Sequence, residues 1–230
     1  MSEERGKKEA NPFGAGEIVN LDAIQQPYRT LSPEHAHFCM SADMNAAAML
    51  DKIHQGMEEE NPPSFTAMLL HIVGKSLLDF PLLNGTFVSE TALAFHPHVH
   101  VAVAIDSPSG LQFPVMADVN ARSVSALHDD IKRLTEEAKN RRFSEEETSG
   151  ATFTVVNLGM FGIAQFNAVL HSSQVAALAV GAIAYRLVMT GNRIINLPFF
   201  TATLTCDARV IDAAMAAKFL QRVNELVEEE

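Results

Sequence analysis

The stretch Thr201–Ala214, TATLTCDARVIDAA, decides the fold because it runs from a strand directly into a helix. Its first half is rich in threonine, which favours a β-strand. The strand pattern stops at Asp207, and Asp212 stands where the N-cap of the following helix belongs. A strand-to-helix corner that carries Asp, Arg and Asp can hold polar side chains rigidly, yet it contains no side chain that titrates near neutral pH. We therefore expect a polar corner without a general base.

Outward from this corner, the chain alternates between helical and strand patterns. Apolar residues recur at helical spacing after four residues that can cap a helix: Asp43, Ser64, Ser123 and Asp212. Ser144 followed by Glu147 is a capping-box pattern at the head of a short helix. Strand patterns cover 38–42, 99–105, 111–116, 152–156, 165–170, 175–189 and 194–206, with hairpin turns at 106–110 and 191–192. Helices and a mixed sheet together predict an α/β two-layer sandwich. We expect a flexible polar arm at 1–16 and a single domain over 17–230.

The composition excludes several classes of function. Hydrophobic residues make up 47% of the 230 positions, and 17 Lys and Arg against 28 Asp and Glu give a formal net charge of −11. Such an acidic chain lacks the basic face that nucleic acid requires. No apolar run approaches the roughly 20 residues that span a bilayer, and no signal or transit peptide is evident. Two cysteines form no disulfide framework, so we expect a cytoplasmic protein.

Several ordered motifs resemble one known family. The segments TFTVVNLGMFG (Thr152–Gly162), QVAALAVGA (Gln174–Ala182) and CDARVIDAA (Cys206–Ala214) are similar to the catalytic domain of dihydrolipoamide acyltransferases. These proteins form the core of 2-oxo-acid dehydrogenase complexes and share the chloramphenicol acetyltransferase fold. The resemblance extends back through Ser109–Leu127 and covers roughly 37–230. It implies a chloramphenicol acetyltransferase-like two-layer sandwich with a mixed β-sheet.

The chain departs from the family at the residues that carry the chemistry. The family corner reads D-H-R-x-x-D-G, and its His is the general base that removes the proton from the thiol of CoA or dihydrolipoamide. A Ser two residues before the other motif's "LG" stabilises the oxyanion. Here Ala208 takes the His position, Val156 the Ser position and Ala213 the Gly position, whereas Arg209 and Asp212 are retained. The resemblance therefore implies that both the catalytic base and the oxyanion donor are lost.

The remaining candidates each have a structural and a functional interpretation. Arg209 and Asp212 could position a ligand, but we favour a buried ion pair and a helix cap. Asn157 could donate into a site, but we favour bonds to backbone at a strand end. Cys206 is expected to pack as a small buried residue rather than act as a nucleophile. His171 is a candidate substitute base, because the resemblance places its segment near the acyl-thioester channel, although an exposed loop histidine is the commoner outcome.

Three alternating histidines, His96, His98 and His100, would share one face if they lay on a strand. Three imidazoles on one face could hold a metal ion with an open position. Pro97 lies among them and indicates an edge strand or a loop. We favour the polarity of an edge strand over a metal site, and we assign no role to His37.

Three hypotheses for function follow. The first is a non-catalytic relative of the acyltransferase core, a homotrimer or larger homo-oligomer that could associate with other 2-oxo-acid dehydrogenase components. The second is an enzyme that depends on acyl-CoA or another acyl-thioester and uses a relocated base such as His171. The third is a binding protein for a thioester or small molecule without turnover. CoA or acyl-CoA is the ligand to test, and neither nucleic acid nor a membrane is an expected partner.

Overall fold

The computed structural model describes residues 17–20, 36–56, 62–171 and 173–229, and the predicted arm at 1–16 lies outside them. Its helices are α1 (Ala47–Gly56), α2 (Phe65–Asp79), α3 (Val124–Asn140), α4 (Glu145–Thr148) and α5 (Ala213–Glu229), with the 3-10 turns η3 (Val119–Ala121) and η4 (Gly159–Phe161). Its strands are β1 (Ile18–Asn20), β2 (His37–Asn45), β3 (Thr86–Ser89), β4 (Ala92–Ala94), β5 (Val101–Val103), β6 (Val115–Met116), β7 (Phe153–Asn157), β8 (Ala176–Val180), β9 (Ala184–Thr190) and β10 (Arg193–Asp207). Among the helices of these residues, none combines the length and the apolar character needed to span a bilayer.

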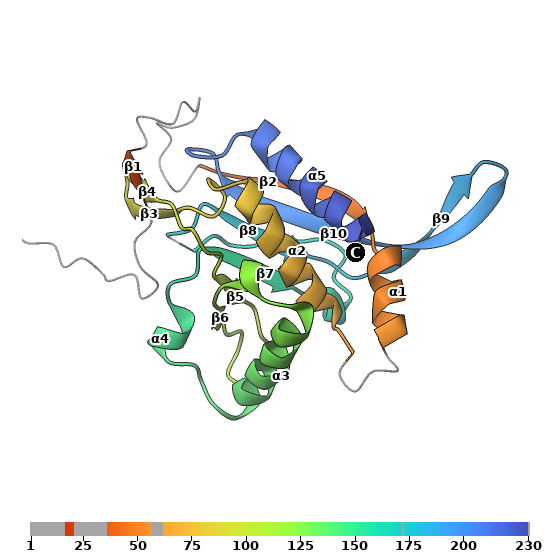
Figure 1. Ribbon diagram of the computed structural model, residues 1–230, viewed down its shortest axis with the longest axis horizontal. Helices are drawn as coiled ribbons and strands as arrows, with labels where there is room; N and C mark the ends of the chain where they lie inside the picture. The colour runs from red at the N-terminus through yellow and green to blue at the C-terminus, as the bar shows by residue number, and fades with distance from the viewer. Residues whose placement is uncertain (1–16, 21–35, 57–61, 172, 230) are drawn as a thin grey trace, which may run out of the picture.

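The predicted α/β two-layer sandwich with a mixed sheet is confirmed. In the described residues, a seven-stranded sheet has the order β2-β10-β8-β7-β5-β6, and β9 pairs with the first part of β10. Strand β7 is parallel to β5 and β8, whereas β10 is antiparallel to β2, β8 and β9. Helices α2 and α5 lie across one face of this sheet, and β9 with the start of β10 forms a long hairpin that projects beyond it (Figure 1). A small antiparallel sheet, β1-β4-β3, lies to one side.

The long strand β10 separates an apolar face from a polar face because successive side chains point in opposite directions. Leu204 is fully buried in the large hydrophobic core beneath the helices. On the helix side of this core, Phe219 of α5 meets Phe80, the C-cap residue of α2, edge to face, with 5.7 Å between the ring centroids. Thr203 faces the other way, and its hydroxyl lies 2.9 Å from that of Ser41 on β2. Strand β10 thus carries the core on one side and polar contacts on the other.

The helix caps were predicted correctly in most cases. Ser64 and Ser123 accept hydrogen bonds from backbone N–H groups of the first turns of α2 and α3. The prediction for Asp43 is wrong, because this residue lies inside β2, which pairs with β10 over all nine of its residues. The first turn of α1 is capped instead by Asn45, whose Oδ1 accepts from the backbone N–H of Ala47 at 3.1 Å.

Several predicted strands are wrong in extent, and those at 99–105 and 111–116 shorten to β5 and β6. The segment 165–170 adopts no regular secondary structure, and the predicted strand 175–189 is divided into β8 and β9 around Gly181. A Cβ atom at Gly181 would lie only 1.9 Å from the carbonyl oxygen of Ala164. The chain after η4 therefore passes directly over this point and interrupts the ladder. Local sequence patterns do not reveal such a contact between distant parts of the chain.

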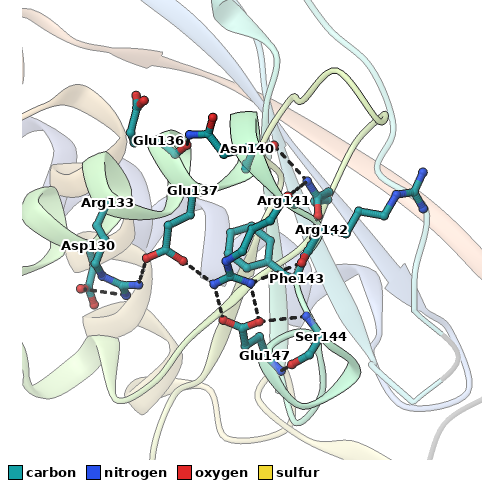
Figure 2. A network of polar contacts seen from close by, with 12 residues as sticks. Asp130, Arg133, Glu136, Glu137, Asn140, Arg141, Arg142, Phe143, Ser144 and Glu147 are labelled. Atoms are coloured by element: carbon teal, nitrogen blue, oxygen red, sulfur yellow. Dashed lines mark hydrogen bonds and ion pairs between the residues drawn. The ribbon is translucent and has the colours of Figure 1, made fainter.

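The predicted capping box at Ser144 is confirmed and belongs to a wider polar network (Figure 2). Glu147 accepts from the backbone N–H of Ser144 at 2.9 Å and from the guanidinium of Arg141 at 2.7 and 2.8 Å. Arg141, followed by the Ser144 N–H, lowers the pKa of Glu147 to about 2. Arg141 also bonds to Glu137, so the network joins the end of α3 to α4. Because these side chains are exposed, water screens the ion pairs and they add little stability.

Candidate functional site

The corner between β10 and α5 is built from polar groups that bond to one another. Asp212 accepts a hydrogen bond from the backbone N–H of Met215 at 2.7 Å, which confirms the predicted N-cap. The carbonyl oxygen of Asp207 accepts from the N–H groups of Val210 at 3.1 Å and Ile211 at 2.9 Å. These bonds turn the chain immediately after the strand and direct it into the helix.

A buried ion pair stabilises the corner. Arg209 donates from Nη2 to Oδ2 of Asp207 at 2.6 Å and from Nε to Oδ1 at 3.0 Å, and Asp207 is only 1% exposed. The guanidinium also lies 4.4 Å from the ring centre of Phe87, a cation–π contact. The ion pair predicted for Arg209 is therefore present, with Asp207 rather than Asp212 as its acid. Sequence reasoning missed Phe87, because nothing local links β3 to this corner.

Ala208 lies between the two members of this ion pair. Its backbone N–H donates to the carbonyl oxygen of Ala36 at 2.6 Å, and the residue is buried. A methyl group can neither accept nor donate a proton, so position 208 provides no general base. The nearby Cys206 is fully buried in the core, and burial raises the pKa of its thiol well above the usual value. A thiol kept neutral in this way packs, as predicted, and is a poor nucleophile.

Val156 and Asn157 end strand β7. Val156 is buried in a second apolar cluster, together with Leu170 and Ala179 among others. The Asn157 side chain accepts from the backbone N–H of Gly159 at 2.9 Å and donates to the hydroxyl of Thr66 on α2 at 3.1 Å. The predicted bond to backbone at a strand end is therefore confirmed. Val156 presents only apolar atoms, so it offers no hydrogen bond to a developing oxyanion.

Within one chain, Val156 and Ala208 lie far apart. Val156 pairs with Ala179, which pairs in turn with Thr203 of β10. Ala208 follows Thr203 by five residues, which at roughly 3.3 Å per residue corresponds to about 17 Å along the strand direction. A reacting group that contacts one position therefore cannot contact the other in the same chain.

His171 lies at the same end of the sheet as the corner. It is exposed, and its Nδ1 lies 3.1 Å from the hydroxyl of Ser173. The carbonyl oxygen of Ser173 accepts from the N–H of Phe87 at 2.7 Å, and Phe87 stacks on Arg209. The predicted exposed loop histidine is therefore present, and it lies in the neighbourhood of the ion pair.

The three alternating histidines lie in a loop, so the edge-strand interpretation is wrong. The side-chain amide of Asn84 donates to the carbonyl oxygens of both His96 and His98, which in a sheet would accept from the backbone of a neighbouring strand. The His96 ring bonds to Thr86 on β3, whereas the His98 and His100 rings both lie beside the Asp118 carboxylate, so the three rings do not converge on one point. In the described part of the chain, no group of three or more His, Cys, Asp or Glu residues is arranged to hold a metal ion.

Comparison with known proteins gives a consistent result. The family model for "2-oxoacid dehydrogenases acyltransferase (catalytic domain)" matches residues 29–230. The dihydrolipoyllysine-residue acetyltransferase component of the pyruvate dehydrogenase complex of Rickettsia felis is 30% identical over 197 residues. That match covers 84% of this chain and 48% of the relative, so the chain spans about half the length of the curated relatives that it matches.

Solved structures agree with this assignment. A probable dihydrolipoamide acetyltransferase from Listeria monocytogenes superposes with a TM-score of 0.78 at 27% identity and covers 84% of each chain. The cubic core of a pyruvate dehydrogenase multienzyme complex gives a TM-score of 0.76 at 25% identity, with 83% of this chain and 81% of the other covered. Chloramphenicol acetyltransferase, at 11% identity and a TM-score of 0.55, shares the fold, as predicted.

Proposed function

Because the chain belongs to the 2-oxoacid dehydrogenase acyltransferase family, we propose that it is a catalytically degenerate member that acts as a structural or assembly core component related to 2-oxo-acid dehydrogenase complexes. The observation that carries this proposal is Ala208. By the resemblance to the family's D-H-R-x-x-D-G corner it takes the position of the catalytic His, in a corner whose ion pair and helix cap are present.

The chemistry of acyl transfer explains why this residue matters. Transfer from a thioester to a thiol requires a base that removes the thiol proton and a donor that stabilises the tetrahedral oxyanion. The chain has Ala208 and Val156 at the two corresponding positions. Removal of either group from an enzyme costs about 10²–10⁴-fold in rate. Two such losses in one chain favour a protein that no longer performs the transfer.

The preserved scaffold supports a role in assembly. Asp207, Arg209 and Asp212 bond to one another or to backbone, and they would maintain the shape of the corner without any chemistry. We propose a homotrimer that can assemble further and contact other 2-oxo-acid dehydrogenase components.

A second candidate function is an acyl-CoA-dependent or acyl-thioester-dependent enzyme with a relocated base. The observation that favours it is the position of His171, an exposed imidazole at the same end of the sheet as Ala208. In this alternative, His171 would accept the proton that the family's His accepts.

The two candidates differ in a direct assay. Purified protein is incubated with acetyl-CoA and dihydrolipoamide, and transfer and acetyl-CoA binding are measured separately, by product formation and by calorimetry. We expect no transfer above the buffer background. Turnover that is abolished in His171→Ala would contradict the proposal and favour the relocated base. Binding without turnover would indicate a thioester-binding protein instead of a purely structural one.

A further inference from the structure

The link between α3 and α4, residues 141–144, reads Arg-Arg-Phe-Ser and has no regular secondary structure. Its backbone is extended at both ends, with φ −150° and ψ 165° at Arg141 and φ −71° and ψ 166° at Ser144. Phe143 packs against the large core, whereas Arg141, Arg142 and Ser144 are exposed. The link thus presents two guanidinium groups and one hydroxyl on the surface of the protein.

The hydroxyl of Ser144 is loosely held. It accepts from the backbone N–H of Glu147 at 3.4 Å, which is long for such a bond. Helix α4 is a single turn, and none of its four residues is buried. Segments held by exposed contacts open locally at a low cost in free energy, because water replaces those contacts. The Ser144 hydroxyl is therefore accessible to an enzyme that modifies it.

The two arginines are also available to another protein. Arg142 donates to the carbonyl oxygen of Ser109 at 3.0 Å, and its side chain points away from Glu147 (Figure 2). Arg141 bonds to Glu137 and Glu147 through exposed ion pairs, which water screens. A guanidinium forms bidentate pairs with carboxylates, so an acidic cleft can bind both side chains at a small cost in lost contacts.

We propose that Ser144 is a phosphorylation site, recognised by a protein kinase whose substrate cleft carries carboxylates that bind Arg141 and Arg142. This inference goes beyond the proposed function, because it depends on neither assembly nor acyl transfer. In the reaction, Oγ of Ser144 attacks the γ-phosphorus of an ATP bound to the kinase, and the bond from that phosphorus to the β–γ bridging oxygen breaks. ADP leaves, and the hydroxyl proton passes to the catalytic Asp of the kinase.

The phosphate would reorganise the network that joins α3 to α4. A phosphoserine carries about −1.5 to −2 charges and three strong acceptor oxygens. Glu147 Oε2 accepts from the Ser144 N–H at 2.9 Å and from Arg141 at 2.8 Å, so one carboxylate separates the guanidinium from the modified residue. Arg141 lowers the pKa of Glu147, which therefore stays ionised and repels the phosphate. We expect Arg141 to leave Glu147 and pair with the phosphate, which opens the capping box.

The test is phosphorylation of the full chain with Mg²⁺, ATP and the catalytic subunit of cyclic AMP-dependent protein kinase, which selects arginines two and three residues before a serine. Mass spectrometry locates the phosphate, and Ser144→Ala identifies the signal of this segment. Arg142→Gln removes one guanidinium, and Lys139→Gln is the matched control, because Lys139 is another exposed cation nearby, outside the two arginine positions. Circular dichroism would verify that the variants fold.

We expect wild type and Lys139→Gln to be phosphorylated on Ser144 at the same rate. Arg142→Gln should react about tenfold more slowly, because one charge-assisted contact to the kinase is lost. A wild-type protein that takes up no phosphate on Ser144 would overturn the site. An unchanged rate in Arg142→Gln would overturn its recognition through the arginines.

A second measurement tests the rearrangement in the phosphorylated protein. The second pKa of a phosphoserine is ordinarily about 6, and a cation beside the phosphate lowers it. Titration followed by ³¹P NMR should therefore give a lower pKa in wild type than in Arg141→Gln. Equal values in the two proteins would overturn the exchange of Arg141 between Glu147 and the phosphate. None of these measurements depends on the oligomeric state or on acyl transfer, so their failure is distinct from a failure of the proposed function.

Discussion

At position 208 the side chain is a methyl group, and the residues on either side of it are polar and bonded to one another. Asp207 and Arg209 form a buried ion pair on either side of it, and Asp212 caps the helix that follows. The backbone N–H of Ala208 bonds to Ala36, which fixes the direction of the chain at this point. The geometry therefore supports a test in which the missing side chain is restored.

We expect the double variant Ala208→His with Val156→Ser to gain a small transferase activity. The two substitutions would supply a base and an oxyanion donor, whose effects are each worth about 10²–10⁴-fold in natural enzymes. The gain should remain well below that of a natural enzyme, because Ala213 and the other residues around the corner are unchanged. The measurement is acetyl transfer from acetyl-CoA to dihydrolipoamide by purified protein.

The matched control is Ala208→Gln with Val156→Ser, which adds a polar side chain of similar size without a base. If the His variant folds and binds acetyl-CoA but shows no more transfer than the Gln variant, the geometry of the corner has changed beyond the loss of one side chain. The interpretation that the corner keeps the backbone geometry for acyl transfer and lacks only the two side chains would then be wrong.

At the scale of the element, the loop between β4 and β5 depends on a neutral histidine. His100 is buried, and its Nδ1 accepts from the backbone N–H of Asp118 at 3.1 Å, where Asp118 has a positive φ of 53°. Burial lowers the pKa of His100. The Asp118 carboxylate raises this pKa by a smaller amount, and the neighbouring His98 lowers it. Burial also lowers the pKa of His96 in the same loop.

We expect the protein to lose stability as the pH falls from 7 towards 5. A lowered pKa in the folded state means that the unfolded chain binds protons first, so acid shifts the equilibrium towards unfolding. His100→Asn should reduce this loss, because an Asn oxygen can accept from Asp118 without titrating. Urea unfolding at several pH values measures the effect. An identical pH dependence in wild type and His100→Asn would show that His100 is not responsible.

At the scale of the whole molecule, the acidic chain must associate against its own charge. Each copy carries a formal charge of −11, so copies repel one another at low ionic strength. The β9–β10 hairpin exposes apolar side chains, Leu187 and Met189 among them, and salt does not screen apolar contacts as it screens the repulsion between charges. The repulsion between the negative charges of the copies thus opposes their association.

We therefore expect added salt to strengthen self-association. The Debye length falls from about 30 Å at 0.01 M to about 3 Å at 1 M ionic strength, which screens repulsion between copies. Sedimentation equilibrium over this range of NaCl would give the dissociation constants. Dissociation of the oligomer as salt is added would instead indicate a contact dominated by ion pairs, contrary to this expectation.

The sequence alone determined the fold class and most of the helix starts, because these depend on local periodicity and local capping. Ser64, Ser123, Ser144 and Asp212 cap helices as predicted, and each cap involves residues within a few positions of one another. The family followed from ordered motifs, since those are also local. The absence of a base at Ala208 is a direct property of the sequence.

Only the tertiary structure decided the features that join distant segments. It assigned Asp43 to a strand, because β10 pairs with β2 through that residue, and it divided β8 from β9 at Gly181, because the chain at Ala164 crosses there. It placed Phe87 against Arg209. Local patterns specify which structures a segment favours, whereas such contacts depend on how the packed elements bring remote residues together.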